Sequence, residues 1–268
     1  MKKQSGQILL ITVMFLAMVL TMVLSISFTS ITETQITKLE EEDKKTLAIA
    51  EAASELALKK QPGSVVNIED LNLGAGFTGQ AIVNNEKSNS FITPLLSKYK
   101  QYTFYLSYPK EISDNQLDFS NLTPEYKNKL LNICSSNDNT ALFLTLIKEG
   151  NPPIIKNYAV NPPANNIINN GVNGNDINIS AHCPSNESFS YYYEISSSDI
   201  ADDSLLLIVK AVNNDAKIGF KAQLNNDFLP LQGKQIISEA KSPVGVAKKI
   251  QFFQSYPQIP AEFFITSF

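Results

Sequence analysis

The sequence has few of the residues and motifs on which catalysis at a metal or phosphate site depends. Its 268 residues include one histidine, His182, which excludes an HExxH zinc site and any metal centre built mainly on imidazole. His182 and Cys183 are immediate neighbours, a poor arrangement for a base and its nucleophile. No phosphate-binding glycine loop and no GxSxG elbow occurs. Nothing in the sequence therefore favours an enzyme, and we expect no cofactor and no metal.

Cysteine is also scarce. Only Cys134 and Cys183 are present, and their spacing excludes a CxxC redox or zinc motif. In an oxidising compartment the pair would form one disulfide that closes a loop of nearly 50 residues, and the alternative is two buried free thiols. Both interpretations are open at this point.

Basic residues are too few to create a nucleic-acid-binding face. Lysine and arginine together number 22 against 26 acidic residues, for a formal net charge of −4. Neutralisation of a phosphate backbone requires a basic patch or stripe. We therefore expect no nucleic-acid partner.

Charge is missing altogether between Lys3 and Glu33, where an apolar stretch runs from Ile8 to Phe28. About 20 apolar residues suffice for a helix to cross a bilayer. Lys2 and Lys3 precede the stretch and no basic cluster follows it, which predicts a cytoplasmic N-terminus with the rest of the chain outside. The sequence thus indicates a single-pass protein of the cytoplasmic membrane.

The segment from Ile31 to Lys60 contains neither glycine nor proline, so the helix should continue beyond the membrane. We predict one helix over residues 7–60, with residues 7–30 as its transmembrane part and a length of roughly 80 Å. It should end at the stop signal Pro62-Gly63. The second half is expected to bury one apolar stripe against the following domain, made of Ile36, Leu39, Leu47, Ala50 and Ala57.

After Pro62 the sequence changes to short β-like runs separated by Gly, Asn and Pro. We predict strands at Phe77–Val83, Tyr102–Tyr108, Ala141–Lys148, Phe189–Ile195, Ser204–Val212, Ala216–Gln223, Lys234–Ser238, Ala247–Tyr256 and Phe263–Phe268. Thr123-Pro124-Glu125 is typical of the start of a short helix. The Asn- and Pro-rich segment 151–180 is predicted to be an exposed loop. The fold class is α+β: a long N-terminal helix packed on a mostly antiparallel β domain, residues 61–268.

The leader and the helix resemble the type IV pilin and pseudopilin family. KKQSG followed by QILLITVMFLAMVLTMV matches the family's short basic leader ending in Gly and its apolar helix, and KKTLAIAEAASELALKK is similar to a segment of minor pilins. The resemblance implies a leader at residues 1–6, cleavage by prepilin peptidase between Gly6 and Gln7, and methylation of the new amine on Gln7. It also implies other pilin subunits and the inner-membrane assembly platform as partners, and an extracellular filament after assembly.

Two positions depart from the family pattern. Most major pilins carry Glu at the fifth mature position, where this chain has Ile11, and Gln7 replaces the usual aromatic residue or Met. A subunit without that acid could sit at a tip or initiate assembly without leaving an unpaired buried carboxylate, which is costly. The resemblance therefore implies a minor, non-enzymatic subunit of a type IV pilus or secretion filament, with surface adhesion and priming of assembly both open as roles. The alternative is an ordinary signal anchor holding an external binding domain.

Overall fold

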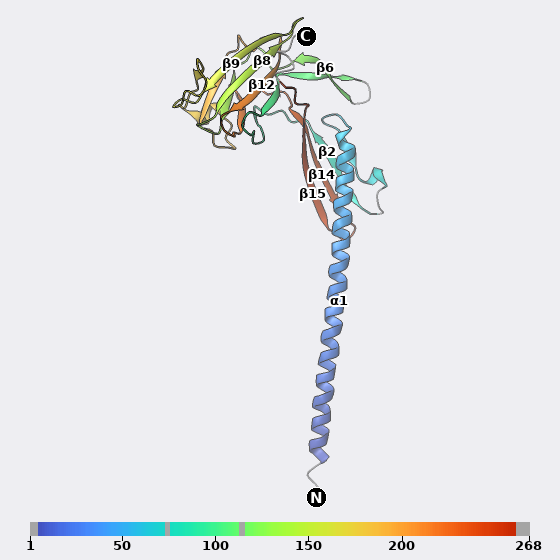
Figure 1. Ribbon diagram of the computed structural model, residues 1–268. Helices are drawn as coiled ribbons and strands as arrows, with labels where there is room; N and C mark the ends of the chain where they lie inside the picture. The colour runs from blue at the N-terminus through green and yellow to red at the C-terminus, as the bar shows by residue number, and fades with distance from the viewer. Residues whose placement is uncertain (1–4, 73–75, 113–115, 261–268) are drawn as a thin grey trace. The chain divides into compact units, whose positions relative to one another are not determined.

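The computed structural model describes residues 5–72, 76–112 and 116–260 (Figure 1). Residues 1–4 of the predicted leader and the predicted strand Phe263–Phe268 lie outside the described residues. The chain divides into two compact units, each described separately below. The first comprises residues 1–57, 65–82 and 236–251, and the second comprises residues 58–64, 83–235 and 252–268. The architecture is α+β, with one long N-terminal helix and mostly antiparallel strands.

The long helix α1 spans Ser5–Leu58, close to the predicted 7–60. Its middle is rich in Ser and Thr, which are middling helix formers because their hydroxyls compete for backbone groups. In α1 these hydroxyls bond within the helix: Thr21 Oγ1 donates to the Met18 carbonyl at 2.8 Å and Ser27 Oγ to the Val23 carbonyl at 2.9 Å. The helix therefore continues through this segment without interruption.

In the first unit, the second half of α1 lies beside strands of a four-stranded sheet (Figure 1). The sheet has the order β1 (Val65–Asn67), β2 (Thr78–Asn84), β14 (Gly233–Lys241) and β15 (Ala247–Ser255). The strand ends 83–84, 233–235 and 252–255 belong to the second unit. A 3-10 turn, η1 (Glu69–Leu71), follows β1. Gly79 in β2 has φ +139°, and a Cβ there would lie 2.0 Å from the carbonyl oxygen of Glu239 in β14. Only glycine permits this close approach of the two strands.

The stripe predicted for α1 is partly wrong. Ala50 and Ala57 are fully buried, but Ile36 and Leu39 are about half exposed and Leu47 is 39% exposed. The buried face instead follows the helical spacing of Thr46, Ile49, Ala50, Ala53 and Ala57. Alanine occupies three of these positions because its small side chain lets the helix backbone approach the sheet closely.

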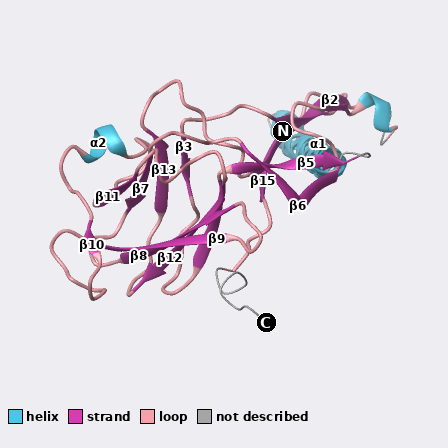
Figure 2. Cartoon of the chain, turned by 90° about the horizontal axis from the view of Figure 1, so that it is seen from above, coloured by secondary structure: helices cyan, strands magenta, loops and turns pink. Residues whose placement is uncertain are grey.

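In the second unit, two sheets pack face to face (Figure 2). The five-stranded sheet has the order β10-β9-β8-β12-β4, and the four-stranded sheet has the order β11-β7-β13-β3. The bounds of the first are β10 (Val172–Asn173), β9 (Ile154–Asn161), β8 (Ala141–Lys148), β12 (Ser204–Val212) and β4 (Gln101–Tyr105). Those of the second are β11 (Tyr191–Ile195), β7 (Leu131–Ser135), β13 (Ile218–Ala222) and β3 (Ser90–Ile92). All described pairs in both sheets are antiparallel except β10 with β9.

Alternating apolar residues of both sheets form the core of this unit. Phe104 of β4 stacks on Phe220 of β13, with ring centroids 4.0 Å apart. Other fully buried members include Leu142, Leu144, Leu146, Leu207, Val209, Leu131, Ile133 and Ile218. The alternation follows from the two-residue period of a strand, which sends every second side chain to the same face.

The prediction of an exposed loop over 151–180 is wrong for its first third. Residues Ile154–Asn161 form β9, which pairs with β8 from Leu142↔Val160 to Lys148↔Ile154. The Asn-Pro pairs on either side favour turns, but the run between them has no proline and provides a partner for the edge of β8. Pairing with a neighbouring strand therefore outweighs the local turn preference.

Two further predictions need correction around a hairpin in the second unit. The single strand predicted at Tyr102–Tyr108 is divided between β4 and β5 (Ser107–Ile112). Thr123 and Pro124 end strand β6 (Gln116–Pro124) and do not start a helix. Pro124 pairs with Ser107 at the end of the β5-β6 ladder, a position where a proline costs little because the pairing stops there.

Candidate functional site

The first half of α1 is an apolar surface that nothing in the described chain covers. Among the described residues, α1 is the one helix long and apolar enough to span a membrane, and none of its most apolar window is buried. Its exposed large apolar side chains are Leu9, Leu10, Ile11, Val13, Met14, Phe15, Leu16, Met18, Val19, Leu20, Met22, Val23, Leu24, Ile26, Phe28 and Ile31. We call residues 9–31 the apolar segment of α1. A patch of this size in water is unfavourable, so lipid or another apolar surface has to cover it.

The polar atoms of this segment suit an apolar environment. Thr29 Oγ1 donates to the Ser25 carbonyl at 2.9 Å, and Thr12 Oγ1 donates to the Leu9 carbonyl at 3.1 Å. Hydroxyls that bond to their own helix do not need water as a partner. Helix formation therefore satisfies these side chains inside a bilayer as well as in water.

The residues of the expected cleavage site, Gly6 and Gln7, lie in the first turn of α1. Ile11, at the fifth position after the expected cut, is 63% exposed. It belongs to the apolar segment and carries no charge that a neighbouring amine could pair with.

The structure joins Cys134 and Cys183 in a disulfide, with a Cα–Cα distance of 5.9 Å. Their sequence separation of 49 corresponds to a stabilisation of roughly 4 kcal/mol from unfolded-state entropy. The bond fastens a segment that carries the short helix α2 (Ile179–His182) onto β7. Since its sulfur is bonded, Cys183 has no thiol that could serve as a nucleophile beside His182.

Lys221 of β13 holds the same segment through hydrogen bonds. Its Nζ donates to the carbonyl oxygens of Ala181 at 2.9 Å and of Cys183 at 3.1 Å. The His182 ring stacks on Tyr192 with centroids 4.2 Å apart. Together with the disulfide, these interactions hold the segment around His182 on strands β7, β11 and β13.

Acidic side chains of the described chain form no metal site. No three His, Cys, Asp or Glu residues within the described ranges gather as ligands. Of the paired carboxylates, Asp203 binds Lys148 Nζ at 3.0 Å, and Asp202 accepts from Asn128 Nδ2 at 2.9 Å. These pairs support the turn before β12.

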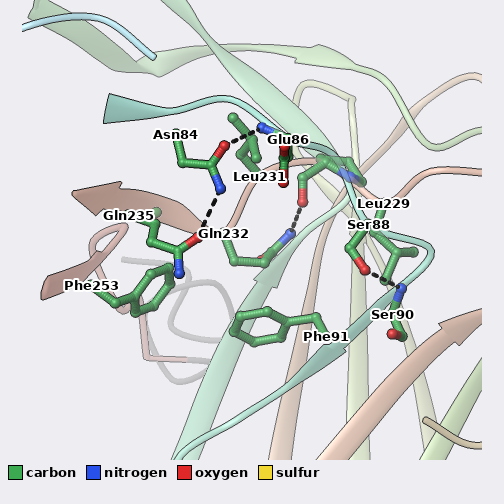
Figure 3. A pocket seen from close by; sticks show the side chains of 12 residues that line it. Asn84, Glu86, Ser88, Ser90, Phe91, Leu229, Leu231, Gln232, Gln235 and Phe253 are labelled. Atoms are coloured by element: carbon green, nitrogen blue, oxygen red, sulfur yellow. Dashed lines mark hydrogen bonds between the residues drawn. The ribbon is translucent and has the colours of Figure 1, made fainter. Parts of the chain in front are cut away.

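A pocket of about 270 Å³ in the second unit was missed by sequence reasoning (Figure 3). Its lining comes from three segments far apart in the chain, so no local motif could reveal it. The lining residues are Asn84, Glu86, Ser88, Ser90, Phe91, Leu229, Pro230, Leu231, Gln232, Gly233, Gln235 and Phe253.

No known protein family, curated protein or solved structure matches this chain. The class that the structure itself defines is an α+β protein with one candidate membrane-spanning helix at its N-terminal end and a mostly antiparallel β domain.

Proposed function

We propose that this protein is a minor pilin or pseudopilin subunit of a type IV pilus or a related secretion filament, without enzymatic activity. The observation that carries the proposal is the combination of a basic leader ending in Gly6 with the uncovered apolar segment of α1 directly behind it. The surface of an apolar helix of this kind can be covered by lipid or by copies of the same helix. One surface can therefore serve as membrane anchor before assembly and as filament core afterwards.

The second half of α1 supports this division of roles. Ala50 and Ala53 are fully buried, and Ser238 of β14 donates to the Ala50 carbonyl at 2.8 Å. Lys248 of β15 forms an ion pair with Asp43 at 2.6 Å. The second half of α1 packs against the sheet, while the apolar segment remains available for contact with lipid or with other subunits.

The composition of the apolar segment fits a rare subunit. Lipid tails compete with apolar side chains, so helix association in membranes depends on close packing at small residues. Between Ile8 and Phe28 the chain has no glycine, and its alanine and serine residues are Ala17, Ser25 and Ser27. Ile11 in place of an acid lets the subunit occupy a tip or an initiating position without burying an unpaired carboxylate. Its partners are other pilin subunits, prepilin peptidase and the inner-membrane assembly platform.

Mass spectrometry of the N-terminus of the protein isolated from membranes tests the proposal. We expect a mature chain that starts at Gln7 with a methylated amine. In the matched variant Gly6→Leu, the leader should be retained while the protein still enters the membrane, because the apolar segment is unchanged. An intact Met1 on the abundant, membrane-bound wild-type protein in cells that contain prepilin peptidase would instead establish the signal-anchor alternative.

A further inference from the structure

The pocket in the second unit has two aromatic walls. Phe91 of β3 and Phe253 of β15 face it with ring centroids 6.2 Å apart and ring planes inclined by 44° (Figure 3). Phe91 also lies 6.4 Å from the core ring of Phe220, so the core holds its position. Phe253 is 45% exposed. A large ring kept at the surface beside a cavity is available for contact with a ligand face.

The polar groups of the pocket are held in fixed orientations. Asn84 Nδ2 donates to Gln235 Oε1 at 3.0 Å, and the backbone N–H of Glu86 donates to Asn84 Oδ1 at 2.9 Å. With its oxygen occupied, Gln235 presents its amide nitrogen on the side of Phe253 (Figure 3). The Glu86 carboxylate and the Ser88 hydroxyl add acceptors at the same pocket.

The base of the pocket is rigid. Gln232 is 4% exposed, and its Nε2 donates to the carbonyls of Tyr105 at 2.9 Å and Pro230 at 2.8 Å. Its Oε1 also accepts from the Tyr105 N–H, so the side-chain amide of Gln232 already has protein partners at both its oxygen and its nitrogen. It therefore shapes the cavity, while the ligand contacts fall to Gln235, Glu86 and the two rings.

The charge of the pocket selects among ligand classes. Glu86 is the only charged residue among the described residues that line it, so phosphate, sulfate and carboxylate ligands find no cation there. Aromatic faces attract polarised C–H groups through the ring quadrupole, and planar amides and carboxylates bind hydroxyls. A volume of about 270 Å³ is slightly below that of pockets for drug-sized molecules, which suits a single ring.

We propose that this pocket binds one neutral sugar ring. The C–H face of the ring lies against Phe253 and Phe91, and its hydroxyls bond to Gln235 and Glu86. Because no residue of α1 lines the pocket, the proposal stands independently of filament assembly.

Saturation-transfer NMR on the full chain in a zwitterionic, sugar-free detergent tests the site. The probes are glucose, galactose, mannose and N-acetylglucosamine, with sialic acid as the anionic comparison. We expect transfer to at least one neutral sugar and none to sialic acid. Phe253→Ala should weaken that binding at least about tenfold, the equivalent of losing an aromatic contact of about 1.4 kcal/mol.

Phe252→Ala is the matched control. Phe252 is adjacent in β15 and 44% exposed, but it points to the opposite face of the strand and does not line the pocket. It should leave sugar binding unchanged, while Gln235→Leu, which keeps the side-chain volume and removes the donor, should weaken it. Absence of transfer to every neutral sugar, stronger binding of sialic acid, or equal losses in the two phenylalanine variants would each overturn the proposal.

Discussion

The side chain of Gln232 hydrogen-bonds both backbone groups of Tyr105. Its Oε1 accepts from the Tyr105 N–H at 2.8 Å, and its Nε2 donates to the Tyr105 carbonyl at 2.9 Å. Tyr105 lies in β4, the edge strand of the five-stranded sheet. An amide side chain thus makes the pair of bonds that a neighbouring strand would make.

A second glutamine extends this cover along the same edge. Gln258 Oε1 accepts from the Thr103 N–H at 2.7 Å, and Thr103 Oγ1 donates to the Ile259 carbonyl at 2.9 Å. Edge strands otherwise expose unpaired backbone groups on which other chains can assemble. The two glutamines therefore satisfy the outward-facing backbone groups, the N–H of Thr103 and the N–H and carbonyl of Tyr105, without a further strand.

Replacement of Gln232 by leucine should destabilise the second unit by at least about 3 kcal/mol. The substitution keeps the volume but leaves three buried backbone groups without partners, namely the N–H and the carbonyl of Tyr105 and the carbonyl of Pro230, and each costs about 1 to 3 kcal/mol. Thermal unfolding followed by near-ultraviolet circular dichroism measures the change.

The control for this prediction is Gln254→Leu, at an exposed position of β15. It should shift the unfolding midpoint little. Similar losses in the two variants would contradict the role assigned to the Gln232 amide.

Substitution of Ala53 by leucine should loosen α1 from its sheet. Ala53 is fully buried, and added methyl groups at a closely packed site cost about 1 to 3 kcal/mol. We expect faster amide hydrogen exchange in residues 46–57 and in β14. Ala48→Leu places the same side chain on an exposed position of the same helix and should leave exchange unchanged, since both residues are good helix formers. Unchanged exchange in the Ala53 variant would contradict close packing of α1 against the sheet at Ala53.

Alkaline pH should unfold the second unit. Burial raises the pKa of Tyr105 to about 12, and burial is also the main cause that raises the pKa values of Tyr102, Tyr126 and Tyr191 above the ordinary 10.0. The native state thus favours the protonated phenol. The stability that the protonated tyrosines contribute is fully present below about pH 10, the pKa of tyrosine in the unfolded chain. It is lost as the pH rises from there through the raised pKa values of the native state.

Tyrosinate absorbance compared with circular dichroism over an alkaline titration tests this prediction. Ionisation of the buried group of tyrosines should coincide with loss of tertiary signal, whereas in denaturant all tyrosines should titrate together near the ordinary value. Full ionisation with the tertiary signal intact would contradict it.

Elements with strong local patterns could be predicted from the sequence. α1 follows from an apolar run and from the absence of glycine and proline over Ile31–Lys60, and β8 and β12 follow from short apolar runs rich in Leu, Ile and Val. β7 was missed because LNICS is five residues long and contains Asn, Cys and Ser, which carry little strand preference. β9 was missed because its flanking Asn-Pro pairs are turn signals, and only the edge of β8 makes it a strand.

The sequence by itself determined the apolar helix and its continuation, because helix hydrogen bonds and hydropathy depend on residues within a few positions of each other. Only the tertiary structure decided which face of α1 is buried, how β4 is closed, and that Asn84, Gln235 and Phe253 line one pocket. These features depend on segments more than a hundred residues apart, and the contacts that create them arise only once the sheets have formed.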